Sequence, residues 1–269
     1  MSNKKIQVKL PNVDHRQYDI VIGDNVVRSL ISIIKKQSVY NVVVITDTNV
    51  KKLYGDKLLS DLKIQLTTYN LQLIAFSAGE KSKTQQTVTK LQNEMFKLKC
   101  GRDTLVVALG GGVVGDTAGY VAATYMRGVP FIQVPTTLLS MVDSSVGGKV
   151  GIDNKYGKNL IGAFHQPLGV FVNINYLSTL SKQHLLGGLC ETIKIFITHD
   201  REMFDYVVKN YEEILNLDKS VLEKIISRAV EIKASVVVRD EKEKGERSVL
   251  NFGHTIGHAI EKLSNYKLL

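Results

Sequence analysis

The order of apolar and polar residues divides the N-terminal part of the chain into strands and helices. Continuous apolar runs, which are typical of buried strands, occur at residues 41–46, 71–76, 104–109 and 131–134. Runs with apolar positions at helical spacing lie between them, at residues 25–36, 50–62, 84–98 and 117–125. Strands that alternate with helices predict an α/β fold in which a parallel sheet carries helices on its faces. Near the start, residues 5–10 and 18–23 alternate apolar with polar positions and predict a hairpin.

The pattern changes near residue 175. Beyond it the chain has almost no strand pattern, and the last proline is Pro167. Apolar residues at helical spacing occupy residues 181–198, 201–216, 218–240 and 248–264. The sequence therefore predicts two domains, a Rossmann-like α/β domain over residues 1–175 and an all-α domain over residues 176–269.

A glycine-rich turn joins the predicted strand at 104–109 to the helix that follows it. A strand, a glycine turn and a helix together direct backbone N–H groups and a helix N-terminus toward an anion. Gly110, Gly112 and Gly115 have the spacing of a dinucleotide-binding fingerprint, but the acidic Asp47 lies before the turn, whereas the fingerprint has its acid after it. A tight connection without any ligand is the alternative interpretation.

Polar side chains follow several of the predicted strands. Asp47 and Asn49 end a buried strand, where an acid can bind ribose hydroxyls or can simply cap the next helix. Glu80 and Gly110 follow two further strands. Because the carboxyl ends of parallel strands meet at one edge of a sheet, we expect these loops to converge on a single crevice.

Composition narrows the class of ligand. With 44% hydrophobic and 23% charged residues, the chain has the balance of an ordinary globular protein. Its net charge of +9 comes from residues spread along the chain rather than from a basic block, so we expect a phosphorylated small molecule rather than nucleic acid. The two cysteines lack metal-site spacing, and no apolar run approaches the ~20 residues of a membrane helix. We therefore expect a cytoplasmic protein with no membrane partner.

Two spacings in the predicted helical domain could carry chemistry. Glu191 and Lys194 lie three residues apart and share a helix face, which a surface ion pair would also explain. His254 and His258 lie four apart on one face, a spacing at which two imidazoles can bind one metal. Thr255 stands where a zinc-protease motif would have Glu. A Glu from one helix with His from another could build a zinc site that keeps an open position.

Taken together, these motifs resemble the 3-dehydroquinate synthase family of the shikimate pathway. The matching segments are residues 79–83, 110–116, 125–128, 134–138, 143–149, 158–159, 191–194 and 251–258, together with Arg247. They occur in the family's order and extend from about residue 45 to the end of the chain. The resemblance implies an NAD-binding α/β domain followed by a helical domain, which agrees with the division predicted above.

The resemblance also implies roles for individual residues. Those expected to line the NAD site are Asp47, Asn49, Glu80, Lys83, Gly111, Gly112, Val113, Asp116, Thr136, Thr137, Lys149, Lys158 and Thr179. Those expected to meet the phosphorylated substrate are Arg127, Asp143, Lys149, Lys158, Asn159, Lys194, Lys233, Arg247, Asn251 and His258, with Arg127 reaching the phosphate across a homodimer interface. Glu191 and His254 are expected to bind zinc or cobalt. The catalytic residues are expected to be Lys149, Lys194, Asn251 and His258.

The implied reaction converts 3-deoxy-D-arabino-heptulosonate 7-phosphate to 3-dehydroquinate and phosphate. Transient oxidation of the C5 hydroxyl by NAD acidifies the neighbouring C–H, and zinc polarises the hydroxyl and the ketone. Phosphate then leaves by elimination, where its charge meets Lys and Arg. Hydride returns, the ring opens, and an intramolecular aldol step closes the carbocycle.

One departure from the family concerns the metal. The family's third zinc ligand is a His in a His-Gly-Glu run, which would be expected just after Leu269, the last residue of the sequence. We therefore expect an incomplete, truncated helical domain with weakened metal binding. The alternative functions are a related sugar-phosphate cyclase, a polyol dehydrogenase of the same superfamily, or an inactive fragment that still binds NAD.

Overall fold

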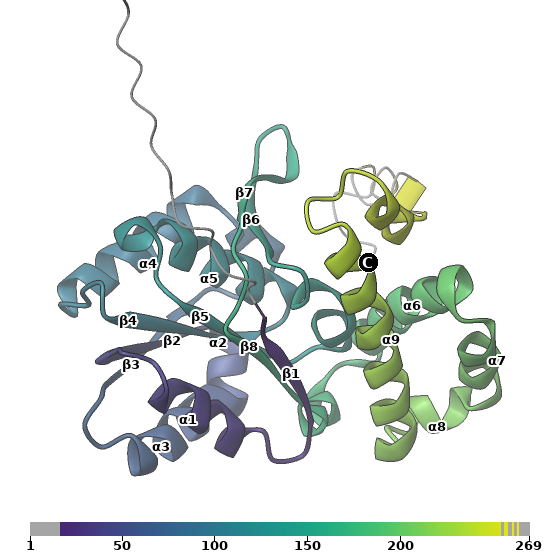
Figure 1. The fold of residues 1–269 in the computed structure, drawn as a ribbon, viewed down its shortest axis with the longest axis horizontal. Helices are drawn as coiled ribbons and strands as arrows, with labels where there is room; N and C mark the ends of the chain where they lie inside the picture. The colour runs from purple at the N-terminus through teal and green to yellow at the C-terminus, as the bar shows by residue number, and fades with distance from the viewer. Residues whose placement is uncertain (1–16, 254–255, 258–259, 261–262, 264–269) are drawn as a thin grey trace, which may run out of the picture.

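A six-stranded sheet forms the centre of the N-terminal part of the molecule, on the left in Figure 1, and the C-terminal helices lie to its right. The computed structural model describes residues 17–253, 256–257, 260 and 263. The strands are β1 (Asp19–Gly23), β2 (Asn41–Asp47), β3 (Asn70–Phe76), β4 (Thr104–Gly110), β5 (Phe131–Pro135) and β8 (Gly169–Asn173). Their order is β1-β8-β5-β4-β2-β3, and every neighbouring pair is parallel. The predicted α/β class and its parallel sheet are confirmed.

Helices cover both faces of this sheet (Figure 1). They are α1 (Val27–Lys35), α2 (Thr48–Val50), the π-helical turn η1 (Lys51–Gly55), α3 (Asp56–Gln65), α4 (Gln85–Lys97) and α5 (Gly112–Thr124). On β2, Val42 and Val44 join a core cluster with α1 and α3, whereas Val43 and Ile45 join a second cluster with α4 and α5. A strand buried on both faces needs apolar residues at every position, which explains the continuous apolar runs of the sequence.

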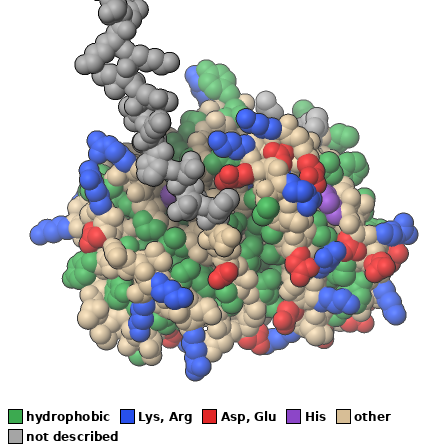
Figure 2. Space-filling model, in the orientation of Figure 1, with side chains coloured by type: hydrophobic (Ala, Val, Ile, Leu, Met, Phe, Trp, Pro, Cys, Tyr) green, Lys and Arg blue, Asp and Glu red, His purple; other side chains and the backbone are tan. Residues whose placement is uncertain are grey.

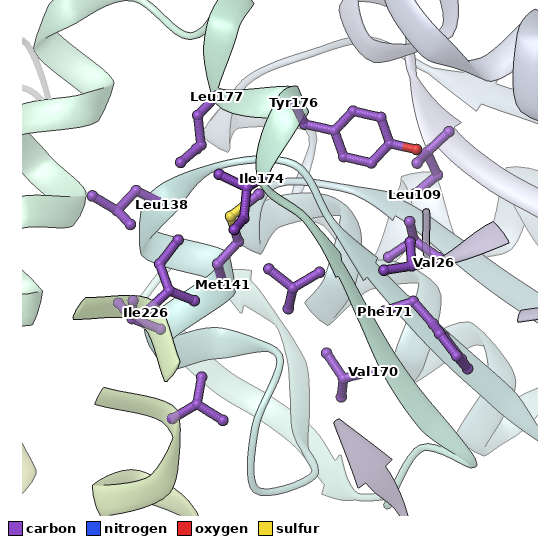
Figure 3. Close-up of a cluster of buried hydrophobic side chains, with 14 of the residues drawn as sticks. Val26, Leu109, Leu138, Met141, Val170, Phe171, Ile174, Tyr176, Leu177 and Ile226 are labelled. Carbon is purple, nitrogen blue, oxygen red and sulfur yellow. The ribbon is translucent and has the colours of Figure 1, made fainter. Parts of the chain in front are cut away.

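The chain after the sheet is helical. The 3-10 segment η5 (Ile174–Thr179) leads into α6 (Lys182–His199), α7 (Arg201–Lys209), α8 (Tyr211–Leu215), α9 (Lys219–Arg239) and the 3-10 turn η6 (Glu246–Asn251). The first core cluster continues from the sheet into these helices, as Leu138, Met141, Ile174 and Ile226 show (Figure 3). No helix in the described part of the chain has the length and apolar composition needed to cross a membrane.

Several elements differ from the sequence prediction, and one predicted pairing stays untested. The segment 201–216 forms two helices, α7 and α8, and the segment from residue 248 begins as the 3-10 turn η6 rather than as an α-helix. The predicted strand at 18–23 exists as β1 and pairs in parallel with β8, whereas its predicted hairpin partner at 5–10 lies outside the described residues. The strand β8 has no counterpart in the prediction.

An antiparallel hairpin that the sequence pattern missed lies beside the sheet. It consists of β6 (Lys149–Asn154) and β7 (Gly157–Phe164), and it projects above α5 in Figure 1. β6 packs on α5, where an added Cβ at Gly119 would lie 2.3 Å from Val150. β7 has no fully buried position and contains two glycines, so it shows neither an apolar run nor a clear alternation. This hairpin carries Lys149, Lys158 and Asn159 to the candidate site.

Candidate functional site

The glycine turn after β4 lies at the carboxyl edge of the sheet. Gly111 precedes α5, and no side chain caps the first turn of this helix. The backbone N–H of Thr136, from the loop after β5, donates to Gly110 at 2.9 Å. An added Cβ would lie 3.1 Å from Thr137 at Gly111 and 3.2 Å from Ser144 at Gly112. The turn therefore packs closely on the segment after β5 and leaves N–H groups of a helix N-terminus available to an anion.

Asp47, at the carboxyl end of β2, caps the helix that follows. Its Oδ1 accepts the N–H groups of Asn49 at 2.8 Å and of Val50 at 2.9 Å. The capping interpretation is thus correct for this oxygen. The structure gives Oδ2 no hydrogen bond within the described ranges, which leaves it able to accept a ligand hydroxyl.

A group of charged residues, here called the Lys83 cluster, lies beside the glycine turn. It consists of Glu80, Lys83, Asp116, Asp153, Lys158 and Asn159. The buried Lys83 Nζ donates to Asp116 Oδ2 at 2.6 Å and also to Asn159 Oδ1. Lys158 Nζ lies 3.8 Å from Glu80 Oε1. The cluster joins the loop after β3, the first helix after β4 and the hairpin β6–β7.

Carboxylates dominate the electrostatics of the Lys83 cluster. Burial disfavours the charge on Lys83, but Asp116, Glu80 and Asp153 together outweigh burial and raise the pKa of Lys83 above its usual value. Burial also raises the pKa of Glu80, and the neighbouring Asp153 adds to that increase. The pKa of Asp116 is raised because burial outweighs the attraction of Lys83.

A second group, the Asp143 cluster, lies where α9 and η6 meet the segment after β5. It consists of Asp143, Lys149, Lys233 and Arg247. The Lys233 ammonium, whose side chain is 6% exposed, donates to both the backbone carbonyl and the carboxylate of Asp143. Burial lowers the pKa of Lys233, although Asp143 opposes the effect. Burial, followed by repulsion from Arg247 and Lys233, lowers the pKa of Lys149 to about 8.

Arg247 is packed against a glycine turn that precedes Lys149. Its Nη1 donates to the carbonyl of Glu241 at 2.6 Å and of Gly147 at 3.4 Å, and burial lowers its pKa. Gly147 has a φ of 101°, and an added Cβ would lie 2.4 Å from Arg247 Nη2. The backbone N–H of Gly147 donates to the Tyr18 hydroxyl at 3.1 Å. This turn is therefore held at once from the residue that precedes β1 and from the helical part of the chain.

Glu243 joins two residues that the sequence assigned to the substrate. Its carboxylate forms an ion pair with Lys149 and accepts a hydrogen bond from the Asn251 side chain. Glu243 itself has a left-handed backbone, with a φ of 55°. Lys149 and Asn251 are thus brought together, although they are far apart in the sequence.

Glu191 and Lys194 form the ion pair that their spacing on α6 predicts. Their side chains are only 12% and 9% exposed, so the interpretation as a surface pair is wrong. His254 and His258 lie outside the described residues. Within the described ranges, no three His, Cys, Asp or Glu side chains are grouped as a metal site would require.

The Lys83 cluster, the Asp143 cluster and the Glu191–Lys194 pair are electrostatic neighbours. Asp143 and Lys233 both influence the pKa of Asp116, which belongs to the Lys83 cluster. Glu191 in turn opposes the lowering of the Lys233 pKa that burial causes. The charges that the sequence assigned to cofactor, substrate and metal therefore adjoin one another in the fold.

Two of the predicted site residues, Arg127 and Thr179, belong to neither cluster. Arg127 is exposed and ends the 3-10 turn η3 (Tyr125–Arg127), which connects the end of α5 to the start of β5. Because α5 runs back along the sheet, Arg127 lies at the amino edge of the strands, opposite the glycine turn. Thr179, at the end of η5, lies at the carboxyl edge, where the Tyr54 hydroxyl is 2.5 Å from its Oγ1.

Sequence reasoning missed Asp153, Glu243 and Tyr18. Asp153 contacts the Lys83 cluster and Glu243 contacts Lys149, but both lie in charged stretches without a motif. Tyr18 lay within a predicted strand as an ordinary half-buried position. Only the tertiary fold reveals their partners. Figure 2 shows Lys and Arg side chains spread among Asp and Glu on the visible face, rather than gathered in one block.

Comparisons with known proteins point to one family. Residues 73–187 match the model described as 3-dehydroquinate synthase N-terminal, and residues 188–269 match the one described as 3-dehydroquinate synthase C-terminal. The 3-dehydroquinate synthase of Thermoanaerobacter pseudethanolicus is 48% identical over 257 residues, which cover 95% of this chain and 72% of that protein. The 3-dehydroquinate synthase of Desulforamulus reducens is 46% identical over 262 residues, or 97% and 72% of the two chains.

Solved structures of sugar-phosphate cyclases have the same fold. A 2-deoxy-scyllo-inosose synthase complexed with carbaglucose-6-phosphate, NAD+ and Co2+ aligns with a TM-score of 0.83 and 29% identity, over 93% of this chain and 67% of that one. The 2-epi-5-epi-valiolone synthase of Streptomyces hygroscopicus, with NAD+ and Zn2+ bound, aligns with a TM-score of 0.86 and 25% identity, over 97% and 72% of the two chains.

Proposed function

The chain belongs to the 3-dehydroquinate synthase family, and we propose that it converts 3-deoxy-D-arabino-heptulosonate 7-phosphate to 3-dehydroquinate and phosphate. The observation that carries the proposal is that α5, which bears Asp116 of the Lys83 cluster, packs on the segment that bears Asp143, so that the two clusters adjoin at the carboxyl edge of the sheet. NAD and a divalent metal, zinc or cobalt, are the proposed cofactors, because the two cyclase structures above contain them. We also propose the division into an α/β domain over residues 1–175 and a helical domain over residues 176–269.

The glycine turn and its surroundings fit NAD. The uncapped N-terminus of α5 suits the pyrophosphate, and an added Cβ at Gly111 or Gly112 would be in tight contact with Thr137 or Ser144. Asp47 retains a carboxylate oxygen for a ribose hydroxyl. The further residues proposed for this site are Asn49, Glu80, Lys83, Val113, Asp116, Thr136, Thr137, Lys149, Lys158 and Thr179. When bound, NAD supplies reversible acceptance of hydride.

The Asp143 cluster fits an anionic substrate. Lys233 contacts the carboxylate of Asp143, and Lys149 and Arg247 lie near enough to interact with it electrostatically. With a pKa of about 8, Lys149 is charged at neutral pH, where it can hold an anionic group, and it can give up a proton at slightly higher pH. Asp143 can orient a substrate hydroxyl as an acceptor. The further residues proposed to contact substrate are Lys158, Asn159, Lys194, Asn251 and His258.

The metal is proposed from the family, with Glu191 and His254 as ligands. Of these two, only Glu191 lies among the described residues, and its carboxylate is paired with Lys194. A cation bound at Glu191 would compete with Lys194 for this carboxylate. A single described ligand does not define a metal centre, so no step of the reaction is derived through the metal.

The position of Arg127 favours a homodimer. Within one chain this residue lies at the edge of the sheet opposite the glycine turn, and this separation supports a contact with the substrate phosphate of another chain's site. We propose that Arg127 reaches the phosphate in the site of a second copy. Mixing an R127A chain with a K233M chain should then restore activity, because one site of the mixed dimer has both residues.

The proposed function is tested by measuring phosphate release from the heptulosonate phosphate with and without NAD. The expected result is release that requires catalytic NAD, accumulates no NADH and stops after exhaustive chelation of divalent metal. Accumulation of NADH without phosphate would indicate a dehydrogenase instead. Turnover that persists after chelation would contradict the metal assignment, and NAD binding without any turnover would support a binding role alone.

A further inference from the structure

The hairpin β6–β7 pairs irregularly beside the Lys83 cluster. Residue 152 pairs with 161 and residue 154 pairs with 157, so Asp153 alone lies opposite the segment 158–160. Lys158 and Asn159, both assigned to ligand contacts, belong to this bulged segment. A bulge bends its strand and turns its side chains in a new direction, and bulges are common next to active sites. A contact outside the regular strand pairing is therefore needed to keep the side chains of Lys158 and Asn159 directed toward the cluster.

Asp153 contacts two of the three segments that carry the Lys83 cluster, the loop after β3 and its own hairpin. Its Oδ1 accepts the backbone N–H of Asn159 at 2.8 Å, and Asn159 has a left-handed φ of 57°. Its own N–H donates to the carbonyl of Lys83 at 2.8 Å, and it forms an isolated bridge with Thr84. Its side chain also hydrogen-bonds the carboxyl group of Glu80.

We propose that Asp153 is a positioning residue of the cofactor site, an inference that rests on the function proposed above. Its carboxylate holds the bulge of β7 in place, so that the Asn159 side chain meets Lys83 and the Lys158 ammonium lies near Glu80. The same carboxylate adds a negative charge next to Glu80, whose other charged neighbours are Lys83 and Lys158. Asp153 thereby acts on the ligand through its neighbours.

The hairpin offers a matched control at Asn154. Its Oδ1 accepts the N–H groups of Tyr156 at 2.8 Å and Gly157 at 3.2 Å, at the exposed tip of the hairpin. Asn154 and Asp153 are adjacent, half-buried and both bond backbone N–H groups of the same hairpin. Of the two, only Asp153 belongs to the Lys83 cluster. A general role in hairpin stability would give the two alanine variants similar effects.

The test is calorimetric titration of NAD into the wild-type chain and the variants D153A, D153N and N154A. D153A should bind NAD about tenfold more weakly, which is the scale of a lost hydrogen bond to a charged group. N154A should stay within about twofold of the wild type. D153N, which keeps an acceptor oxygen for Asn159, should recover most of the affinity at neutral pH. Thermal unfolding followed by circular dichroism checks that each variant folds.

A pH profile of NAD affinity separates positioning from a structural role, even if D153A fails to fold. The Asp153 charge raises the pKa of Glu80, so removing the charge in D153N lowers that pKa. The acid limb, where Glu80 takes up a proton and accepts a ligand hydroxyl less well, should shift to lower pH in D153N. An unshifted limb, or equal binding by D153A and the wild type, would overturn this inference alone. A wild-type chain that binds no NAD would overturn it together with the proposed function.

Discussion

The Lys83 cluster and the Asp143 cluster place buried lysines in opposite electrostatic settings. Lys83 and Lys233 are both buried, with side chains 5% and 6% exposed, and each pairs with an aspartate. Nevertheless the pKa of Lys83 is raised and that of Lys233 is lowered. Burial acts in the same direction on both, so the remaining neighbours decide the outcome.

The charges of those neighbours differ in sign between the two lysines. Around Lys83, the carboxylates of Glu80 and Asp153 add to that of Asp116, whereas Lys233 shares Asp143 with Lys149 and Arg247. A carboxylate-rich group suits the hydroxyls of a cofactor ribose, and a cation-rich group suits a phosphorylated, carboxylated substrate. NAD is therefore assigned chiefly to the Lys83 cluster and the substrate chiefly to the Asp143 cluster. Lys158 and Asn159 of the first cluster are also proposed to contact the substrate, and Lys149 of the second is also proposed to line the NAD site.

The largest effect is expected from K233M in the Asp143 cluster. This variant leaves the Asp143 carboxylate without its buried ammonium partner and removes a cation from the substrate side. We expect kcat/KM for the heptulosonate phosphate to fall about 10²–10³-fold, the scale of losing one preorganised charged contact. The control is K219M on the same helix, whose exposed ammonium lies 3.6 Å from Asp24 and should contribute little. Equal losses in both variants would contradict the assignment.

K83M should weaken NAD binding rather than substrate binding. Loss of this cation leaves Asp116 and its neighbouring carboxylates unneutralised, and it frees the Asn159 side chain. We expect the dissociation constant for NAD to rise about 10–100-fold, which calorimetry can measure. K81M changes an exposed lysine two residues away and should bind NAD as the wild type does. NAD affinity that is the same in K83M and K81M would remove Lys83 from the cofactor site.

Two glycine substitutions compare how closely the two clusters are packed. Gly79 and Gly147 have φ values of 102° and 101°, so alanine is strained at both positions. An added Cβ meets nothing within 4 Å at Gly79, but it lies 2.4 Å from Arg247 at Gly147. G79A should therefore lower the free energy of unfolding by about 1–2 kcal/mol, and G147A by roughly 2 kcal/mol more. Chemical denaturation measures both, and equal losses would show that Arg247 moves aside without penalty.

The smallest effect is expected in the pH profile. Lys149 has a pKa lowered to about 8, so its charge is present below that pH and is lost above it. Substrate binding that uses this charge should weaken above about pH 8, by up to tenfold per pH unit. K149R, which stays charged, should extend the alkaline limb of kcat/KM to higher pH. A profile that is identical in K149R and the wild type would exclude Lys149 as the titrating group.

The sequence predicted the sheet well because its central strands are buried on both faces. β2 and β4 have short, unbroken apolar runs rich in β-branched residues, and this length and composition favour a buried strand over a helix. The hairpin β6–β7 was missed because it is stabilised by contacts with α5 and by Asp153 rather than by its own periodicity. The apolar pattern of the sequence thus identifies strands that are fully buried, and it gives little evidence for a strand that is half exposed.

The candidate site shows the same limit. The Glu191–Lys194 pair follows directly from helix spacing, because both residues lie on α6. Lys233 and Asp143 are separated by 90 residues, and Lys83 and Asn159 by 76, so no spacing rule could pair them. Motif resemblance named most of these residues, but it could not reveal which ones touch. Their roles toward NAD, substrate and metal stay predictions, as do those of His254 and His258 outside the described residues.

The separate assignment of the two clusters is tested most directly by crosswise calorimetry. NAD is titrated into the wild type, K83M and K233M, and the heptulosonate phosphate is then titrated into each in the presence of saturating NAD. We expect K83M to lose at least tenfold in NAD affinity while its substrate affinity stays within about threefold of the wild type, and K233M to show the reverse. Variants that each weaken the binding of both ligands to the same extent would contradict the separate assignment.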